Sequence, residues 1–148
     1  METIRKAVQS DSGSIIAFQQ AMALETEGLD LEIDLLTKGV AAVFEIPARG
    51  QYWVCEIDGE VIASLLITYE WSDWRNADVW WFQSVYVIPE HRRKGIFRKM
   101  YDTIKREAEA SSVAGLRLYV ESNNLNARKT YEAMGMSSEH YTMYEWLR

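Results

Sequence analysis

The chain has 148 residues, a net charge of −6 at pH 7 and 48% hydrophobic residues, so we predict a single domain over residues 1–148 with a real hydrophobic core. The single cysteine, Cys55, excludes an internal disulfide and a cysteine-based zinc site. The acidic charge argues against nucleic acid as a partner. No apolar run is long enough to span a bilayer and the N-terminus has no apolar signal core, so we expect a cytoplasmic protein without a membrane partner.

The first third of the chain is predicted to contain one strand and two helices. Asp11 or Ser12 can cap the first helix, because short polar side chains accept a hydrogen bond from the first free amides of a helix. The predicted elements are a strand over residues 4–8, a helix with Ile15, Phe18 and Met22 on its buried face, an acidic loop over residues 23–31 and a helix over residues 31–45.

The middle of the chain is predicted to form three strands, over residues 51–57, 61–71 and 79–88. Asp58-Gly59 is a strong signal for a hairpin turn of type I′, since both central positions of that turn need a positive φ. The long apolar run of the third strand indicates that it is buried on both faces.

A basic loop, Arg92-Arg93-Lys94-Gly95, joins the third strand to an amphipathic helix. The buried face of that helix follows the spacing expected for one side of a helix, with Phe97, Met100, Tyr101, Ile104 and Ala108. Residues 92–99 contain five Lys or Arg and no acid. Because a helix start offers unpaired N–H groups and a partial positive charge, this stretch is predicted to bind a phosphate-bearing anion.

The remaining elements complete an α/β (α+β) fold. We predict a strand over residues 116–121, a helix over 124–134 and a last strand over 141–147. The early hairpin requires antiparallel strands, whereas the strand–helix–strand run over residues 79–121 requires a crossover. The expected architecture is therefore a mixed, mostly antiparallel sheet of six to seven strands with helices on both faces.

Two motifs resemble the GNAT family of acyl-CoA N-acyltransferases. Residues 85–97 resemble the family's acyl-CoA motif, [Gln/Arg]-x-x-Gly-x-[Gly/Ala], with Arg92 and Gly95 in the matching positions. Residues 124–136 are similar to its Asn-x-x-Ala-x-x-x-Tyr-x-x-x-Gly-Phe run, through Asn124, Ala127, Tyr131 and Gly135. One such motif is weak evidence, but two in register on the expected elements are strong. The resemblance implies the GNAT fold and acetyl-CoA as the cofactor.

The resemblance also implies roles for particular residues. The loop amides would cradle the pyrophosphate of coenzyme A, the strand edge at residues 85–87 would bind its amide-containing arm, and an N–H near Val85 would polarise the thioester oxygen. Tyr131 would donate a proton to the departing thiolate. The implied cofactor-binding residues are Val85, Tyr86, Val87, Arg92, Arg93, Lys94, Gly95, Ile96, Phe97, Arg98, Asn124, Ala127 and Tyr131.

Two residues depart from the family pattern. Phe97 replaces a small residue, and we expect its ring to join the buried stripe of its helix. Gln83 lies where several small-amine acetyltransferases carry a glutamate base, and an amide cannot accept a proton at neutral pH. A base, if one is used, would come from elsewhere through a water molecule; Glu25 and Glu70 are the predicted candidates, with Glu27 and Asp73 also in range.

The implied reaction is the direct attack of a primary amine on the thioester of acetyl-CoA through a tetrahedral intermediate. Tryptophans and carboxylates predict an acceptor pocket for a small cationic amine, although the same tryptophans would also suit core or homodimer packing. A protein or peptide amine is an alternative acceptor, and a CoA-binding module without turnover is an alternative function. No metal site is expected, because His91 and His140 show no metal-ligand spacing. The predicted acceptor-binding residues are Glu27, Trp71, Trp74, Trp80 and Gln83.

Overall fold

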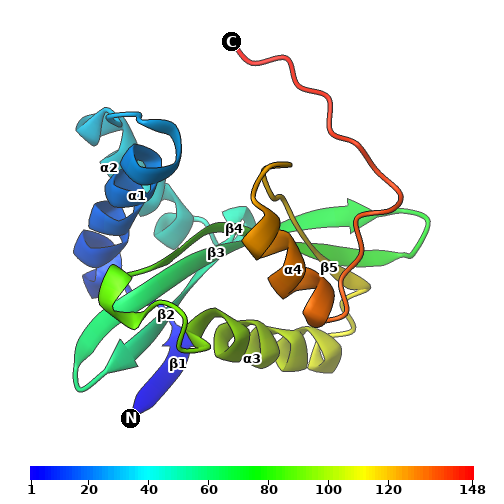
Figure 1. Cartoon of the computed structure of the whole chain (residues 1–148), viewed down its shortest axis with the longest axis horizontal. Coiled ribbons are helices and arrows are strands. Elements are labelled where there is room, and N and C mark those ends of the chain that lie inside the picture. The colour runs from blue at the N-terminus through cyan, green and yellow to red at the C-terminus, as the bar shows by residue number, and fades with distance from the viewer. The chain divides into compact units, whose positions relative to one another are not determined.

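The computed structural model describes residues 1–148, which form two units, Met1–Leu118 and Tyr119–Arg148. The first unit contains one sheet of five strands in the order β1-β2-β3-β4-β5 (Figure 1). The strands β1 to β4 pair antiparallel, and β5 pairs parallel to β4, so the sheet is mixed. The strands are β1 (Glu2–Lys6), β2 (Gln51–Ile57), β3 (Glu60–Ser72), β4 (Ala77–Val87) and β5 (Gly115–Leu118).

Helices cover both faces of this sheet, as predicted (Figure 1). On one face, α1 (Ser12–Glu27) and α2 (Ile33–Glu45) pack on the sheet through a buried cluster that includes Ile15, Val40 and Val54. On the other face, α3 (Ile96–Ala110) buries Met100, Tyr101, Ile104 and Ala108, and the ring of Tyr101 lies 5.4 Å from that of Phe82 on β4. The amphipathic pattern of α3 therefore determines which of its faces meets the sheet.

The hairpin of β3 and β4 contains a bulge. Ser64 pairs with Tyr86, but Leu66 pairs with Gln83, so Ser84 and Val85 together oppose one residue of β3. Ser84 has φ 52°, in the left-handed region that non-glycine residues seldom adopt. An extra residue in one strand bends that strand and redirects its side chains and backbone groups.

Beyond the bulge, one edge of β4 has no strand partner within the first unit. β5 pairs with β4 only from Val79 to Phe82, because β5 ends at Leu118. The N–H of Ile88 donates to the carbonyl of Ile62, which makes Val87 and Ala63 a non-hydrogen-bonded pair. The N–H and C=O of Val87 consequently face the open edge, whereas those of Tyr86 face β3.

Two local predictions had different outcomes. The type I′ turn is confirmed, since Asp58 and Gly59 have φ 50° and 82°. The loop predicted from residue 23 is wrong, because α1 continues to Glu27. Gly28 ends the helix in the left-handed conformation, with its N–H donating to Leu24 and the N–H of Leu29 donating to Ala23. The glycine, rather than the acidic composition, marks the end of the helix.

The second unit contains one helix, α4 (Leu125–Ala133), and no strand. The predicted strand over residues 141–147 is wrong, and so is the count of six to seven strands. Alternating apolar residues favour a strand only where a neighbouring strand pairs with their backbone. Here Tyr144 and Trp146 are instead 94% and 85% exposed. Segments shorter than roughly 40 residues seldom fold alone, and residues 119–148 form such a short segment. The expectation of one domain over the whole chain stays a prediction.

Candidate functional site

The loop between β4 and α3 presents a group of backbone amides at a helix start. Arg93 and Gly95 have φ 63° and 77°, so the chain turns twice through the left-handed region before α3 begins at Ile96. The first-turn amides of Ile96, Phe97 and Arg98 have no acceptor within their own helix. Such a turn followed by a helix N-terminus forms an anion-binding concavity.

Three side chains of the loop and of the first turn of α3 leave their positive charge in solvent. Arg93, Lys94 and Arg98 are exposed and form no ion pair. The side chain of Ile96 is buried, so this residue can offer a ligand only its amide. The amides and the three free cations thus meet the requirements of a phosphate group.

Arg92 differs from the other cations of the loop because its side chain turns onto the protein. Its Nε donates to the carbonyl of Val87 at 2.8 Å, and its terminal nitrogen Nη2 donates to Oε2 of Glu25 at 2.8 Å. Its guanidinium lies over the ring of Tyr86 at 5.2 Å. The hydroxyl of Tyr86 donates to Oε1 of Glu25 at 3.2 Å. Glu25 lies in the last turn of α1, so these contacts join α1, β4 and the loop.

The packing predicted for Phe97 is confirmed. Its ring lies 6.0 Å from Phe82 and 6.3 Å from Tyr101, half-buried between α3 and the sheet. A ring at this position therefore adds to the core.

The predicted acceptor residues lie on opposite faces of the sheet. Gln83 donates its side-chain amide to Thr68 at 2.7 Å, and both residues share the α1 face with Leu66, which packs on the cluster of α1 and α2. Trp80 lies on the α3 face, where its ring is 6.0 Å from Tyr69. Alternating residues of a strand point to opposite faces, so Trp80 and Gln83 cannot line one pocket.

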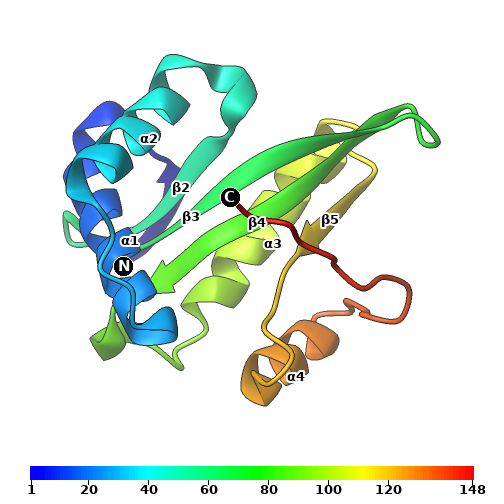
Figure 2. The ribbon, with the colours of Figure 1, turned by 90° about the horizontal axis from the view of Figure 1, so that it is seen from above.

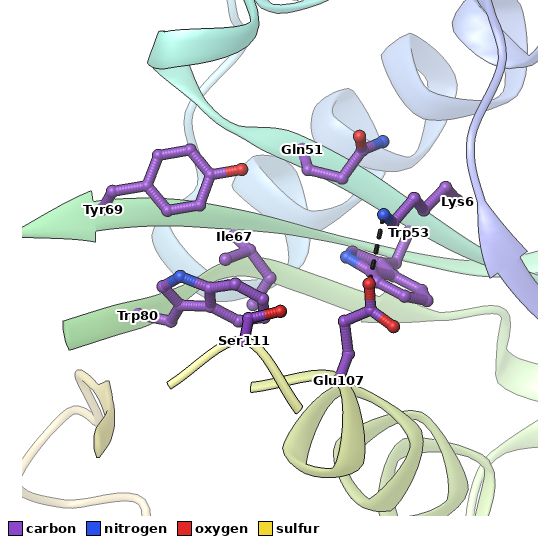
Figure 3. A pocket seen from close by; sticks show the side chains of 8 residues that line it. All are labelled: Lys6, Gln51, Trp53, Ile67, Tyr69, Trp80, Glu107 and Ser111. Carbon is purple, nitrogen blue, oxygen red and sulfur yellow. Dashed lines mark ion pairs between the residues drawn. The ribbon is translucent and has the colours of Figure 1, made fainter. Parts of the chain in front are cut away.

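Trp80 instead lines a pocket beside the C-terminal end of α3 (Figure 3). This pocket has a volume of about 160 Å³, and an ion pair between Lys6 and Glu107 at 3.3 Å borders it. Glu107 and Ser111 lie at the end of α3 opposite to Gly95, so the pocket is separate from the basic loop. Its lining residues are Lys6, Gln51, Trp53, Ile67, Tyr69, Trp80, Glu107 and Ser111.

The other predicted aromatic residues lie at the far end of the β3–β4 hairpin, which runs past the end of β2 (Figure 2). Trp71 is 61% exposed, and Trp74, in the connecting turn, is 90% exposed. Ala77 and Ser84 are seven residues apart on β4, which corresponds to about 23 Å at ~3.3 Å per residue. The two tryptophans therefore lie far from the bulge.

The two predicted bases lie on different elements, Glu70 on this hairpin and Glu25 on α1. Glu70 pairs in register with Val79, about 17 Å along β4 from Ser84, and its Oε1 accepts from Arg117 at 2.6 Å and from Trp81 at 3.1 Å. Glu25 is next to the bulge, through Tyr86. Glu27 is exposed at the end of α1. Of these carboxylates, Glu25 is thus the one held beside the open edge of β4 by side-chain hydrogen bonds.

The second unit holds the residues of the second motif. The side chain of Asn124 accepts from the N–H of Ala127 at 3.1 Å, so Asn124 caps α4. Tyr131 is half-buried on α4, and burial raises the pKa of its hydroxyl above the ordinary value of 10.0. The phenol therefore keeps its proton at neutral pH and can act as a proton donor.

Comparison with known proteins gives the family. Residues 19–136 match the family model of the acetyltransferase (GNAT) family. The chain belongs to this family. GNAT acetyltransferases use acetyl-CoA as the acetyl donor, which matches the amide-rich loop and its free cations.

Solved structures of GNAT proteins share the fold over the whole chain. A possible acetyltransferase from Clostridium difficile 630 is 44% identical, with a TM-score of 0.92 over 100% of this chain and 98% of the other. Ribosomal-protein-alanine N-acetyltransferase from Brucella melitensis biovar Abortus 2308 is 16% identical, with a TM-score of 0.81 and full coverage of both chains. A predicted acetyltransferase with acetyl-CoA from Clostridium acetobutylicum is 18% identical, with a TM-score of 0.77 over 98% and 96% of the two chains. A search of curated proteins gave no match.

Sequence reasoning missed several residues of the site. It predicted a role for the backbone of Tyr86, but the side chain of Tyr86 makes the contact with Glu25. It gave no role to Ser84 or Thr68, because no sequence motif signals a bulge or a cross-strand partner. No three His, Cys, Asp or Glu side chains are grouped to hold a metal ion, and no helix has the length and apolarity to cross a membrane.

We predict that Gly95→Val weakens coenzyme A binding by roughly tenfold or more, because a β-branched residue at φ 77° costs about 1–3 kcal/mol and the loop would change its path. Calorimetric titration with coenzyme A measures the effect. Gly39→Ala, at an uncrowded position in α2, is the control and should leave affinity unchanged. Equal affinity of the Gly95 variant and wild type would contradict the predicted role of this turn.

Proposed function

We propose that this protein is an N-acetyltransferase that transfers the acetyl group of acetyl-CoA to a primary amine by direct attack. The observation that carries the proposal is the bulge of β4 at Ser84, within residues 83–87, which have no strand partner on one edge within the first unit because β5 ends at Leu118. A strand edge can bind an extended amide-containing chain, and a helix start can bind its phosphates. The pyrophosphate ligands proposed are the amides of residues 95–98 with Arg93, Lys94 and Arg98.

The chain's own residues would stabilise charge, donate a proton and support the cofactor arm. Acetyl-CoA supplies an activated acetyl group as a thioester. The N–H of Val87, on the open edge, and the N–H of Val85, in the bulge, would stabilise negative charge on the carbonyl oxygen and orient the amide-containing arm. Tyr131 would give its proton to the thiolate as the carbon–sulfur bond breaks, and Asn124 and Ala127 would support the cofactor arm. These assignments to the second motif rest on the family resemblance.

The proton lost by the amine would go to water in this proposal. Both oxygens of Glu25 already accept hydrogen bonds, from Tyr86 and Arg92, and Glu70 lies about 17 Å along the hairpin from the bulge. A base must come within hydrogen-bond reach of the proton it takes, directly or through one water. We therefore do not retain Glu70 as the general base. Glu25 stays a prediction, because each of its carboxylate oxygens can accept a second hydrogen bond, from a water that carries the proton.

The acceptor would approach from the α1 face, where Gln83 and Thr68 lie beside the bulge. The side-chain nitrogen of Gln83 donates to Thr68, so its carbonyl oxygen is left to accept from an amine. The net charge of −6 favours a cationic acceptor through long-range attraction. A small cationic amine suits these features, with a protein or peptide amine as the second candidate.

The test is mass spectrometry of two acceptor sets incubated with acetyl-CoA, one of small mono- and diamines and one of peptides with a free α-amine or lysine. We expect a product heavier by one acetyl group in the small-amine set. Acetylation confined to the peptide set would overturn the small-amine proposal. Tight binding of acetyl-CoA with no product in either set across a broad pH range would instead support a binding module without turnover.

A further inference from the structure

We propose that Arg92 is a positioning residue that holds the open end of β4 and the last turn of α1 together, and that it does not bind phosphate. Arg92 occupies the first position of the acyl-CoA motif, so its charge alone would assign it to the pyrophosphate. This inference deepens the proposed function and rests on coenzyme A as the ligand.

The contacts of the guanidinium carry the inference. Nε donates to the carbonyl of Val87 and Nη2 to Glu25, both at 2.8 Å, while the plane lies over Tyr86. The two hydrogen bonds come from different nitrogens of one planar guanidinium, a geometry that the single ammonium group of a lysine cannot reproduce. Arg93, the next residue, is exposed and forms no ion pair. The two arginines therefore have different tasks despite their adjacent positions.

Glu25 and Tyr86 complete the arrangement. Tyr86 is only 7% exposed, its ring lies 5.3 Å from Phe18 of α1, and its hydroxyl donates to the second oxygen of Glu25. One carboxylate thus accepts from both the strand and the loop. The side chains of Arg92 and Glu25 are each 41% exposed, so the ion pair adds little to stability and its main effect is geometric.

Arg92 orients backbone groups on the strand edge that would bind the amide-containing arm of coenzyme A. The N–H and C=O of Val87 face that edge, and Arg92 takes the carbonyl. This contact fixes the orientation of the peptide group that follows Val87 and leaves the N–H of Val87 and the backbone of Val85 for the ligand. Loss of Arg92 should therefore weaken the binding of the part of the ligand that has no phosphate.

Two ligands separate a positioning role from a phosphate role. Coenzyme A contains both the amide arm and the phosphates, whereas pantetheine contains the arm alone. We expect Arg92→Ala to raise the Kd of both ligands by the same factor, about tenfold, measured by calorimetry for coenzyme A and by NMR titration for pantetheine. The matched control, Arg93→Ala, should weaken coenzyme A alone. A loss confined to coenzyme A in Arg92→Ala would overturn the proposal.

A conservative variant keeps the test valid if Arg92→Ala unfolds. Arg92→Lys retains the charge, so a phosphate ligand would keep most of its affinity, whereas a positioning fork would lose as much as in Arg92→Ala. Retained affinity of Arg92→Lys for coenzyme A would overturn the proposal.

Variants of Glu25 provide a second test, because Glu25 lies on α1, outside the basic loop that would bind the phosphates. Glu25→Gln should weaken both ligands, and the Glu25→Gln/Arg92→Ala double variant should lose no more than Arg92→Ala alone. Glu45→Gln, at the exposed end of α2, is the matched control and should bind as wild type. Additive losses would overturn the coupling. All these readouts are binding constants, so a protein that binds coenzyme A without acetylating any amine would contradict the proposed function and leave this inference intact.

Discussion

Tyr131→Phe is expected to lower kcat for acetyl transfer by roughly 100-fold, the lower end of what a positioned general acid contributes. The variant lacks the hydroxyl that would protonate the thiolate, and the ring keeps its packing on α4. The Kd of coenzyme A should change little, because the proton is needed only when the carbon–sulfur bond breaks. Single-turnover kinetics with saturating acetyl-CoA measures the loss directly.

The pH profile gives an independent check on Tyr131. Burial raises the pKa of this hydroxyl above its ordinary value of 10.0, so the acid form is complete at neutral pH and is lost only as the pH rises through that higher pKa. The wild-type kcat should therefore show no decline caused by Tyr131 until the pH exceeds that ordinary value, and the Phe variant should lack the alkaline decline. Tyr144→Phe, 94% exposed in the same unit, is the control and should retain full activity. A Tyr131→Phe enzyme as fast as wild type would remove the acid role.

Ser84→Val is expected to lower the free energy of unfolding by about 1–3 kcal/mol and kcat/KM by roughly 100-fold. Ser84 has φ 52°, which a β-branched side chain tolerates poorly, so the bulge would shift or disappear. Loss of the bulge changes the register of β4 beyond Gln83 and moves the N–H of Val87, which faces the open edge, together with the neighbouring backbone of Val85. Urea unfolding and steady-state kinetics measure the two effects.

Two further serine variants separate the backbone effect from the loss of a hydroxyl. Ser84→Gly also lacks the hydroxyl but adopts φ 52° without strain, so it should retain most stability and activity. Ser72→Val places the same side chain at the end of β3, away from the bulge, and should change stability by a few tenths of a kcal/mol. If Ser84→Gly is as inactive as Ser84→Val, the hydroxyl rather than the backbone is what the enzyme needs.

Local sequence signals predicted much of the fold and proposed a candidate site for the acetyl donor. The type I′ turn at Asp58-Gly59, the amphipathic α3 and its basic start are each encoded within a few neighbouring residues. The two motifs, at residues 85–97 and 124–136, are sufficient to indicate the GNAT family. Such features are predictable because backbone preferences, helix periodicity and helix-end chemistry act over short distances along the chain.

The errors arose where a segment depends on a distant partner. The tail over residues 141–147 has the apolar alternation of a strand, but a strand also needs a neighbour for its backbone groups, and local sequence does not contain that neighbour. The close spacing of the tryptophans in residues 71–81 predicted that they line one pocket. The register of β3 and β4 instead places Trp71 and Trp80 on the α3 face and Gln83 on the α1 face.

The family, the basic loop before α3 and the identity of the family's acetyl donor follow from the amino-acid sequence, because each depends on residues close together in the chain. The role of Arg92 and the position of the open edge of β4 follow only from the packing of distant elements. Arg92 and Glu25 are 67 positions apart, and the bulge at Ser84 exists only in relation to β3. The role of a charged side chain in a motif depends on the residue that it contacts in the folded protein, and that residue can lie far away in the sequence.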